Sequence, residues 1–397
     1  MANINKFFRY VQINTQSDNL SQTYPSTMCQ KDLGNLLVKE LLALGLKDAH
    51  MDEWGNVYAH LAGSGDRIGF NAHMDTALEV TGKNVKPAII RGYKGGAIKL
   101  ANGLIMSPAQ FPGLKKHIGH DLVVTDGNTL LGADDKAGIA IIMSALEYIV
   151  AHKEIPHKNL SICFTVDEEI GKGTKHFNYQ KMNADYAYTV DGADPDIIEA
   201  ENFNARGVEI TIEGVSVHPG EGKDQLINAI LVAQEFLNFM PSKETPHDSE
   251  GYQGFWHATN ISGDPDTAKI RLILRDFNPN GMAQRVNDVK FAVEQAKQKY
   301  PKANFKVNIF DQYQNMKPFV DKKPQVVEYA KEALKKNGLT PRLNAIRGGT
   351  DGADMSKNGL IAPNLGTGSY NHHGRFEYLD IQEFEKMVQV VITLMKK

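Results

Sequence analysis

One short stretch constrains the fold of this chain more than any other. Residues 161–166 are apolar and rich in β-favouring side chains, and three acids follow at positions 167–169. Such a segment is typical of a buried strand. Open α/β sheets place their binding sites beyond the carboxyl ends of their strands. The stretch therefore predicts an α/β fold with a site at one sheet edge, although three adjacent acids can also form a solvated turn.

Other predicted strands end in metal-binding residue types as well. Residues 67–76 form a strand pattern that ends in His73 and Asp75, whose side chains share one face because strand side chains alternate. Another strand, at residues 184–190, is followed directly by Asp191. A histidine binds a metal through one ring nitrogen, and a nearby carboxylate fixes the other nitrogen. Each motif alone is common in surface pairs, so the prediction depends on their combination.

Two further segments supply acids and histidines. Asp134 and Asp135 stand just before the apolar helical stripe of residues 139–149. Acids at a helix start can cap the helix and interact with its dipole. The alternative is that one carboxylate turns inward and bridges two cations. Near the C-terminus, a glycine-rich segment presents His372 and His373 side by side.

The α/β pattern is interrupted in the second half of the chain. Strands are predicted at residues 208–212, 255–262, 269–277 and 305–310, and helices at 225–239 and 281–300. This β-α-β-β-α-β order is that of a ferredoxin-like domain. The α/β pattern resumes with a helix from Lys323. We therefore predict a discontinuous α/β domain, residues 1–204 and 321–397, that carries an inserted domain at residues 205–320. The first part begins with two helices between residues 3 and 46.

Composition sets the class of protein. The chain has 397 residues, 42% of them hydrophobic and 23% charged, and a formal net charge of -3. These values are typical of a globular protein and give no overall attraction to nucleic acid or anionic lipid. The sequence shows no membrane-length apolar run and no signal peptide pattern. With only two cysteines, we expect no structural disulfide and a cytoplasmic location.

Five of the singled-out side chains form a coherent ligand set for two metal ions: His73, Asp134, Glu169, Asp191 and His373. Two histidines, two terminal carboxylates and one shared carboxylate would give both metals a similar shell with room for a water. Such mixed donors suit zinc, and also cobalt or manganese. Without metals, these acids would repel one another and the neighbouring Glu168.

The sequence also resembles the di-zinc aminoacylase and carboxypeptidase family of metallopeptidases, and within it the cytosolic tripeptide aminopeptidases. The resemblance rests on motifs at residues 72–76, 125–127, 132–138, 167–173, 188–192, 217–220, 346–353 and 370–374. These motifs follow one another in order over nearly the whole chain. The resemblance implies a catalytic di-zinc domain with an inserted lid or dimerisation domain, a small peptide substrate and two zinc ions.

The resemblance also implies individual roles. One metal would be held by His73 and Asp191 and the other by Glu169 and His373, with Asp134 as the bridge and a cis peptide bond between Asp134 and Asp135. Asp75 would orient His73, Glu168 would act as general base, and His218 would contact the substrate carbonyl. The family pattern has a tyrosine where this chain has His372. Which histidine of the pair binds metal is therefore open.

Substrate recognition is the least constrained part of the prediction. Arg275 and Arg347 are candidates for binding a substrate carboxylate, since arginine binds carboxylates through a planar fork, although each can also form a structural ion pair. The predicted activity is release of the first residue of a tripeptide. A dipeptidase or N-acyl amino acid deacylase of the same clan is the alternative, and an inactive metal- or peptide-binding protein is the alternative of another class. The presence of Glu168 argues against an inactive protein, because a binding protein needs no general base beside its metals. The sequence leaves open whether the chain forms a homodimer.

Overall fold

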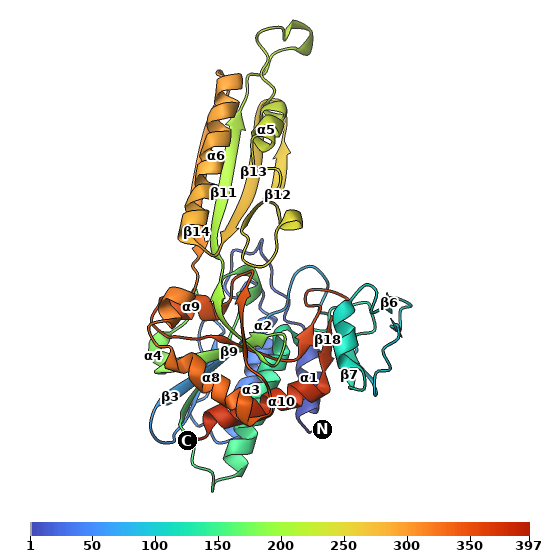
Figure 1. The fold of residues 1–397 in the computed structure, drawn as a ribbon, viewed down its shortest axis with the longest axis vertical. Helices are drawn as coiled ribbons and strands as arrows, with labels where there is room; N and C mark the ends of the chain where they lie inside the picture. The colour runs from blue at the N-terminus through green and yellow to red at the C-terminus, as the bar shows by residue number, and fades with distance from the viewer. Residues whose placement is uncertain (1) are drawn as a thin grey trace. The chain divides into compact units, whose positions relative to one another are not determined.

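The computed structural model describes residues 2–397 and contains two compact units (Figure 1). The first unit comprises the chain up to Ala200 together with Met316–Asn344 and Thr350–Lys397. The second comprises Glu201–Asn315 and Ala345–Gly349. The sequence placed the bounds of the insert at residues 205 and 320 and did not include 345–349. Met1, the first residue of the predicted domain 1–204, lies outside the described residues.

The first unit contains an eight-stranded sheet. Its strand order is β1 (His50–Met51), β2 (Val57–Leu61), β8 (Asn159–Thr165), β3 (Arg67–His73), β9 (Tyr186–Gly192), β16 (Asn364–Gly366), β10 (Ile197–Asn202) and β15 (Arg342–Ile346). The central strands β8, β3, β9 and β16 are parallel, whereas β1, β2 and β10 pair antiparallel with their neighbours. The parallel centre matters for function because it brings the carboxyl ends of β3, β8 and β9 to one edge of the sheet.

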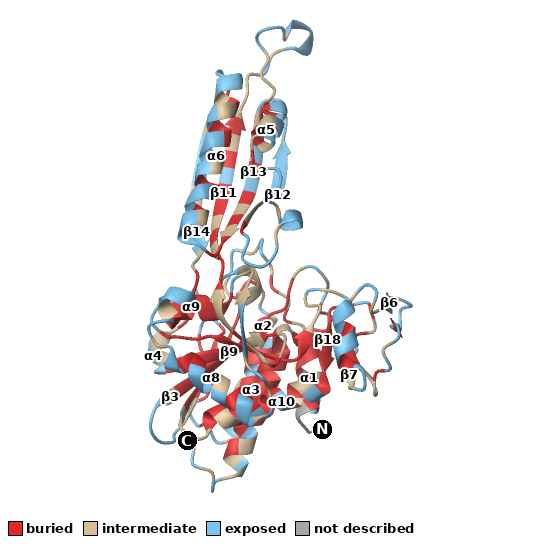
Figure 2. Cartoon of the chain, viewed as in Figure 1, coloured by how far each residue is buried: buried red, intermediate tan, exposed pale blue. Residues whose placement is uncertain are grey.

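The helices of the first unit surround this sheet. They are α1 (Ala2–Val11), α2 (Gln30–Ala43), α3 (Ala133–Ala151), α4 (Tyr179–Met182), α7 (Lys317–Val320), α8 (Gln325–Lys336), α9 (Asp351–Lys357) and α10 (Ile381–Met395). Helix α3 packs against α1, α10, β3 and β9 and is buried over most of its length, as its nearly uninterrupted apolar sequence requires (Figure 2). The two helices predicted between residues 3 and 46 are confirmed by α1 and α2. No helix within residues 2–397 has the length and apolar character of a membrane span.

A smaller sheet completes the first unit. Its order is β17 (Ser369–Tyr370), β18 (Tyr378–Asp380), β7 (Leu122–Val124) and β4 (Ala88–Ile90). Between β4 and β7 lie the hairpin of β5 (Ile98–Lys99) and β6 (Ile105–Met106) and the 3-10 helix η1 (Pro112–His117). The sequence did not predict that this segment pairs through β7 with β18, because that pairing joins residues far apart in the chain.

The second unit has the predicted ferredoxin-like order. Its elements are β11 (Asn204–Glu213), α5 (Ala229–Asn238), β12 (Phe255–Gly263), β13 (Thr267–Asp276), α6 (Pro279–Lys299) and β14 (Asn304–Tyr313), and its antiparallel sheet has the order β12-β13-β11-β14. Val208, Ile210 and Ile212 alternate inward along β11 into one core with Phe236. Helix α5 begins at Ala229 and not at the predicted 225, because the Asn228 side chain accepts a hydrogen bond from the Ile230 amide and caps the helix there.

Candidate metal centre

The predicted site residues of the first unit meet at the edge where the parallel strands end. His73 is the last residue of β3, Asp191 lies near the end of β9, and Glu168 and Glu169 follow β8 in the 3-10 helix η2 (Glu168–Ile170). Asp134 comes to the same place from the start of α3. The fold therefore gathers these side chains because the strands run parallel, as the positions of acids and histidine at strand ends indicated.

A first group of ligand atoms forms around His73. Its Nε2 lies 2.9 Å from Oδ1 of Asp134 and 3.5 Å from Oδ1 of Asp191. The ligand atoms of these three residues all lie within 4.8 Å of one another. Burial alone would lower the pKa of His73, but Asp191 first and then Asp134 raise it well above its ordinary value. In the absence of metal, a proton on His73 therefore offsets the negative charge of this group.

A second group forms around His373. Its Nε2 lies 3.0 Å from Oε2 of Glu169 and 3.2 Å from Oδ2 of Asp134. His372, by contrast, has its Nε2 2.8 Å from the hydroxyl of Ser369, and only its Nδ1 approaches Asp134, at 3.5 Å. His373 has a left-handed backbone with φ of 61°, a conformation that is uncommon outside glycine. The geometry favours His373 as the histidine of the second group.

The two acids at the start of α3 have different partners. Asp134 directs one carboxylate oxygen to His73 and the other to His373, so it belongs to both groups. Asp135 accepts hydrogen bonds from the backbone amides of His73, at 3.2 Å, and Gly138, at 3.1 Å. The peptide bond between the two residues is cis, as the family resemblance implies. Asp134 has the position of a bridging ligand, and Asp135 serves the capping role that acids have at helix starts.

Asp75 contacts more than the histidine it was predicted to orient. Its Oδ1 lies 3.3 Å from Nδ1 of His73 and also accepts a hydrogen bond from the Glu168 amide at 3.0 Å. Its Oδ2 accepts from the Glu169 amide at 3.1 Å. One fully buried carboxylate thus positions residues of both groups and the backbone of Glu168.

Glu168 stands beside the groups without belonging to either. Burial raises the pKa of Glu168 well above its ordinary value, and the carboxylates of Asp191, Asp351 and Glu169 raise it further against the opposing effect of His73. A carboxyl group with a raised pKa next to a metal centre is suited to accept and return a proton near neutral pH.

Glu377 is a functional neighbour that sequence reasoning missed. Its buried carboxylate accepts hydrogen bonds from the amides of Leu131 (2.7 Å), Gly132 (2.8 Å) and Asp134 (3.1 Å). It therefore holds the turn from which Asp134 reaches both groups. No local signal marks this role, because Glu377 is 243 positions away from Asp134 in the chain.

The gathered side chains fit metal ions. Oε1 of Glu169 has no hydrogen-bond partner, and water cannot easily supply one because the side chain is only 5% exposed. In the described part of the chain, no lysine or arginine forms an ion pair with Asp134, Glu168, Glu169 or Asp191. Buried carboxylates require a cationic partner, and here only the histidines supply one. An unsatisfied oxygen beside imidazole nitrogens is what a metal would complete.

Three predicted residues belong to the second unit. His218 is exposed and precedes the 3-10 helix η3 (Pro219–Glu221), and its Nδ1 accepts a hydrogen bond from the Gly220 amide. Arg275 donates to the Leu274 carbonyl at 3.0 Å and to Oε1 of Gln312 at 2.9 Å.

Arg347 is held within its own unit. It donates to the carbonyls of Gly251 and Gln253 and to the Ser249 hydroxyl, and its guanidinium lies over the ring of Phe203. These contacts link Arg347 to the segment 249–253.

Comparison with known proteins identifies the family of this chain. The model of Peptidase family M20/M25/M40 matches residues 120–397. The chain belongs to this family. It is 43% identical to peptidase T of Bacillus subtilis over 400 residues, which cover 99% of this chain and 98% of the relative. It is 44% identical to peptidase T of Caldanaerobacter subterraneus over 399 residues, which cover 99% of this chain and 98% of the relative.

Solved structures share the fold of this M20/M25/M40 peptidase. Aminopeptidase PepT of Bacillus cereus has a TM-score of 0.76 at 23% identity, over 99% of this chain and 97% of that one. A tripeptidase of Staphylococcus aureus has a TM-score of 0.79 at 22% identity, over 99% and 97%. The predicted family and fold class are thereby confirmed, and the chain is a metal-dependent peptidase.

We expect the metal-free protein to release protons when it takes up zinc. Hydrogen bonds to Asp134 and Glu169 raise the pKa of His373 to about 11, and burial, followed by repulsion from Asp134, raises that of Glu169 to about 7. A metal ligand must be deprotonated, so zinc displaces these protons and its affinity increases with pH. The number of protons released per chain is measured by isothermal titration calorimetry at pH 7 in two buffers of different ionisation enthalpy.

The matched variants are His373→Ala and His50→Ala. Removing His373 should lower the proton release by at least about one per chain, because its own proton is gone and the zinc of its group binds less well. His50 is exposed and hydrogen-bonds only locally to Asp48, so its removal should leave the release unchanged. Equal proton release by the His373 variant and the unchanged protein would contradict the assignment.

Proposed function

We propose that this chain is an aminopeptidase that removes the first residue of tripeptides. The observation that carries the proposal is the pair of ligand groups that share Asp134, with the free carboxyl group of Glu168 beside them. The relatives named peptidase T support the choice of activity within the family, since they match nearly the whole chain. The family resemblance supports two zinc ions, and the same donors also suit cobalt or manganese.

The ligands divide between two metals. His73 and Asp191 would hold one and Glu169 and His373 the other, with Asp134 between them. Metals at these ligands supply Lewis acidity toward the peptide carbonyl and acidify a water. Asp75 would keep the ligand shell in place through His73 and the backbone of the η2 turn.

Glu168 handles the proton in this proposal. Its carboxylate would take the proton of the attacking water and deliver it to the leaving amine, and a group with a raised pKa performs both transfers near neutral pH. Its amide is held by Asp75, so the backbone beneath the carboxylate has a defined position. Glu168 can therefore be changed without removing a ligand from either group.

The change Glu168→Gln tests this role. We expect kcat to fall by at least about a hundredfold, the scale of losing a positioned acid–base group, with metal content unchanged. Elemental analysis after extensive dialysis, together with peptide turnover, measures both. The comparison variant is Glu169→Gln, which should lose metal as well as activity because Glu169 belongs to a ligand group. Loss of metal from the Glu168 variant would make Glu168 a ligand and this role wrong.

His218 has the hydrogen bonding of an oxyanion donor. Its Nδ1 accepts a hydrogen bond from the Gly220 amide at 3.2 Å, which places the proton of the neutral ring on Nε2. The ring is exposed, so this N–H is available to a substrate oxygen. We propose that it binds the oxygen of the scissile carbonyl.

Replacing His218 with alanine should lower kcat by about a hundredfold or more, the effect of losing one such donor. His257 of the same unit is exposed on β12 and serves as the control, since its replacement should leave kcat unchanged. Steady-state kinetics with a tripeptide measures both variants. Normal turnover by the His218 variant would remove this residue from the mechanism.

We propose that Arg275 binds the C-terminal carboxylate of the substrate. Arginine matches a carboxylate through its planar fork. We choose Arg275 over Arg347 because Arg275 donates to one carbonyl and one side-chain amide, whereas Arg347 donates to three carbonyls and a hydroxyl within its unit. A longer or shorter peptide would leave the arginine without a carboxylate partner, and such a mismatch is a strong source of specificity.

A substrate panel tests both the activity and the arginine. An unblocked tripeptide should be cleaved at least about tenfold more efficiently, in kcat/KM, than a dipeptide, a tetrapeptide, an N-acyl amino acid or the C-terminally amidated tripeptide. Arg275→Ala should remove most of the difference between the acid and the amide. Arg271→Ala, an exposed arginine on the same strand, is the control and should retain it. Preferred cleavage of N-acyl amino acids would instead indicate the deacylase alternative.

A further inference from the structure

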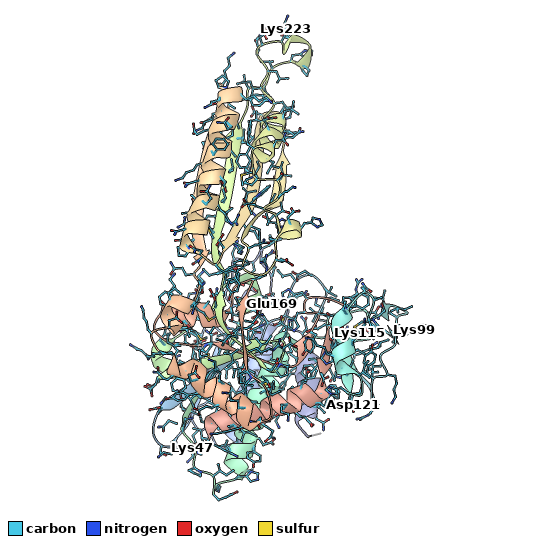
Figure 3. The ribbon with its side chains drawn as sticks, viewed as in Figure 1. Lys47, Lys99, Lys115, Asp121, Glu169 and Lys223 are labelled. Carbon is cyan, nitrogen blue, oxygen red and sulfur yellow. The ribbon has the colours of Figure 1, made fainter. Side chains whose placement is uncertain are left out.

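A second concentration of metal-binding side chains lies in the first unit, apart from the centre described above. It consists of His117 and His120, from the end of η1 and the turn after it, and of Asp380 and Glu383, from the start of α10. None of the four belongs to the His73 or His373 groups. Figure 3 labels Lys115 and Asp121 on the segment that carries the two histidines, well to the right of Glu169.

The four side chains converge on a small volume. Nδ1 of His117 lies 2.9 Å from Oδ2 of Asp380 and 3.7 Å from Oε1 of Glu383, and Nδ1 of His120 lies 2.6 Å from the same Asp380 oxygen. The four ligand atoms are all within 4.8 Å of one another. Bonds of 2.0–2.1 Å in a tetrahedral site separate neighbouring ligand atoms by about 3.3 Å. The observed distances between ligand atoms, 2.6 to 3.7 Å, lie on both sides of 3.3 Å. Small shifts of the side chains would therefore produce a tetrahedral site.

Helix capping explains only part of this arrangement. Asp380 and Glu383 have the spacing of a capping box, and Oδ1 of Asp380 does accept from the Glu383 amide at 3.0 Å. In a capping box, the glutamate would reach back to the amide of the capping residue. The Asp380 amide donates instead to the Gly368 carbonyl. The Glu383 carboxylate is therefore free to face His117, and Oδ2 of Asp380 is free to face both histidines.

The charges of the group call for a cation. His117 and Asp380 are fully buried, and within residues 2–397 no lysine or arginine forms an ion pair with Asp380 or Glu383. Burial raises the pKa of Glu383, whereas hydrogen bonds from His117, the Glu383 amide and His120 together outweigh burial and lower the pKa of Asp380. The buried carboxylate of Asp380 and the half-buried carboxylate of Glu383 share only two imidazoles and lack a permanent positive partner.

His117 has one ring nitrogen without a partner. Its Nε2 is buried without a hydrogen-bond partner, and its ring packs against the rings of Tyr370 and Tyr378. Its Nδ1 lies within hydrogen-bond distance of Oδ2 of Asp380, so without metal a proton joins these two atoms. A metal ion bound at Nδ1 would take the place of that proton, and the neutral ring would then carry its proton on Nε2.

We infer that these four side chains bind one divalent ion of the zinc class at a structural site separate from the catalytic centre. Two imidazoles and two carboxylates complete a tetrahedral shell and leave no open position, which distinguishes a structural from a catalytic zinc site. Glu383 also accepts a hydrogen bond from the Tyr370 hydroxyl at 2.7 Å, the outer support typical of a ligating carboxylate. The ion would fasten the segment between β4 and β7 to the start of α10.

Zinc content tests this inference directly. The unchanged full-length protein, His120→Gln and His60→Gln are stripped with a chelator, reloaded with excess zinc, passed through a desalting column and analysed by mass spectrometry for metal. We expect the His120 variant to bind one equivalent per chain fewer than the unchanged protein, with kcat/KM on a tripeptide changed by less than about twofold. His60 is the matched control, because it pairs with a single aspartate, Asp48, and belongs to no metal group in the described chain.

A second variant keeps the test decisive. If His120→Gln does not fold, Glu383→Gln removes a different ligand and should show the same loss of one equivalent. Zinc should also raise the Tm of the stripped unchanged protein more than that of either variant, because an ion that binds only the folded state stabilises it. Equal zinc content in the unchanged protein and the variant would mean that only protons link these side chains, and would overturn the inference. Loss of peptidase activity together with the ion would overturn its separation from the catalytic centre.

Discussion

Repulsion among buried carboxylates is the interaction on which the rest of the first unit depends. Burial raises the pKa values of Glu168, Glu169 and Asp191. Neighbouring carboxylates raise them further: Asp191 and Glu169 act on Glu168, and Asp134 acts on Glu169 and Asp191. The pKa of Asp134, by contrast, lies well below its ordinary value despite its burial, because His372, His373 and His73 surround its carboxylate. An arrangement of this kind is costly as a bare polar cluster and stable as a metal centre. The fold thus has its metal requirement built into the charges at one sheet edge.

The neighbouring polar groups serve the backbone around the ligands. Asp75, Asp135 and Glu377 are buried carboxylates that accept hydrogen bonds from main-chain amides beside the ligands, and none of them belongs to a ligand group. Buried amides need partners in any fold. Here the partners are charged, so the bonds are stronger than bonds to neutral acceptors and keep the turns that carry Asp134, Glu168 and Glu169 in one conformation.

The second unit shows how far local patterns reach. Alternation along β11 and the apolar stripe of α6 predicted the ferredoxin-like order, because strand and helix periodicities can both be read from neighbouring residues in the sequence. The start of α5 was misplaced, since the capping bond of Asn228 decides it and residues 225–227 carry no contrary signal. Arg347 is a candidate for substrate binding, and its contacts with residues 249–253 are visible only in the folded chain.

The sequence by itself determined the family, most of the elements and the residue types of the candidate metal centre. Apolar periodicity and strand-end acids are local features, and parallel strands bring their ends together by geometry alone. The family resemblance named Asp134 as the bridge. Only the tertiary structure decided that Asp135 turns to backbone amides, that His373 lies closer to the ligands than His372 does, and that Glu377 supports the turn of Asp134. The group of His117 and Asp380 is also visible only in the tertiary structure, because 263 positions separate these two residues in the chain. Contacts of that span depend on how β7 and β18 pair, and no local pattern in either segment encodes the other.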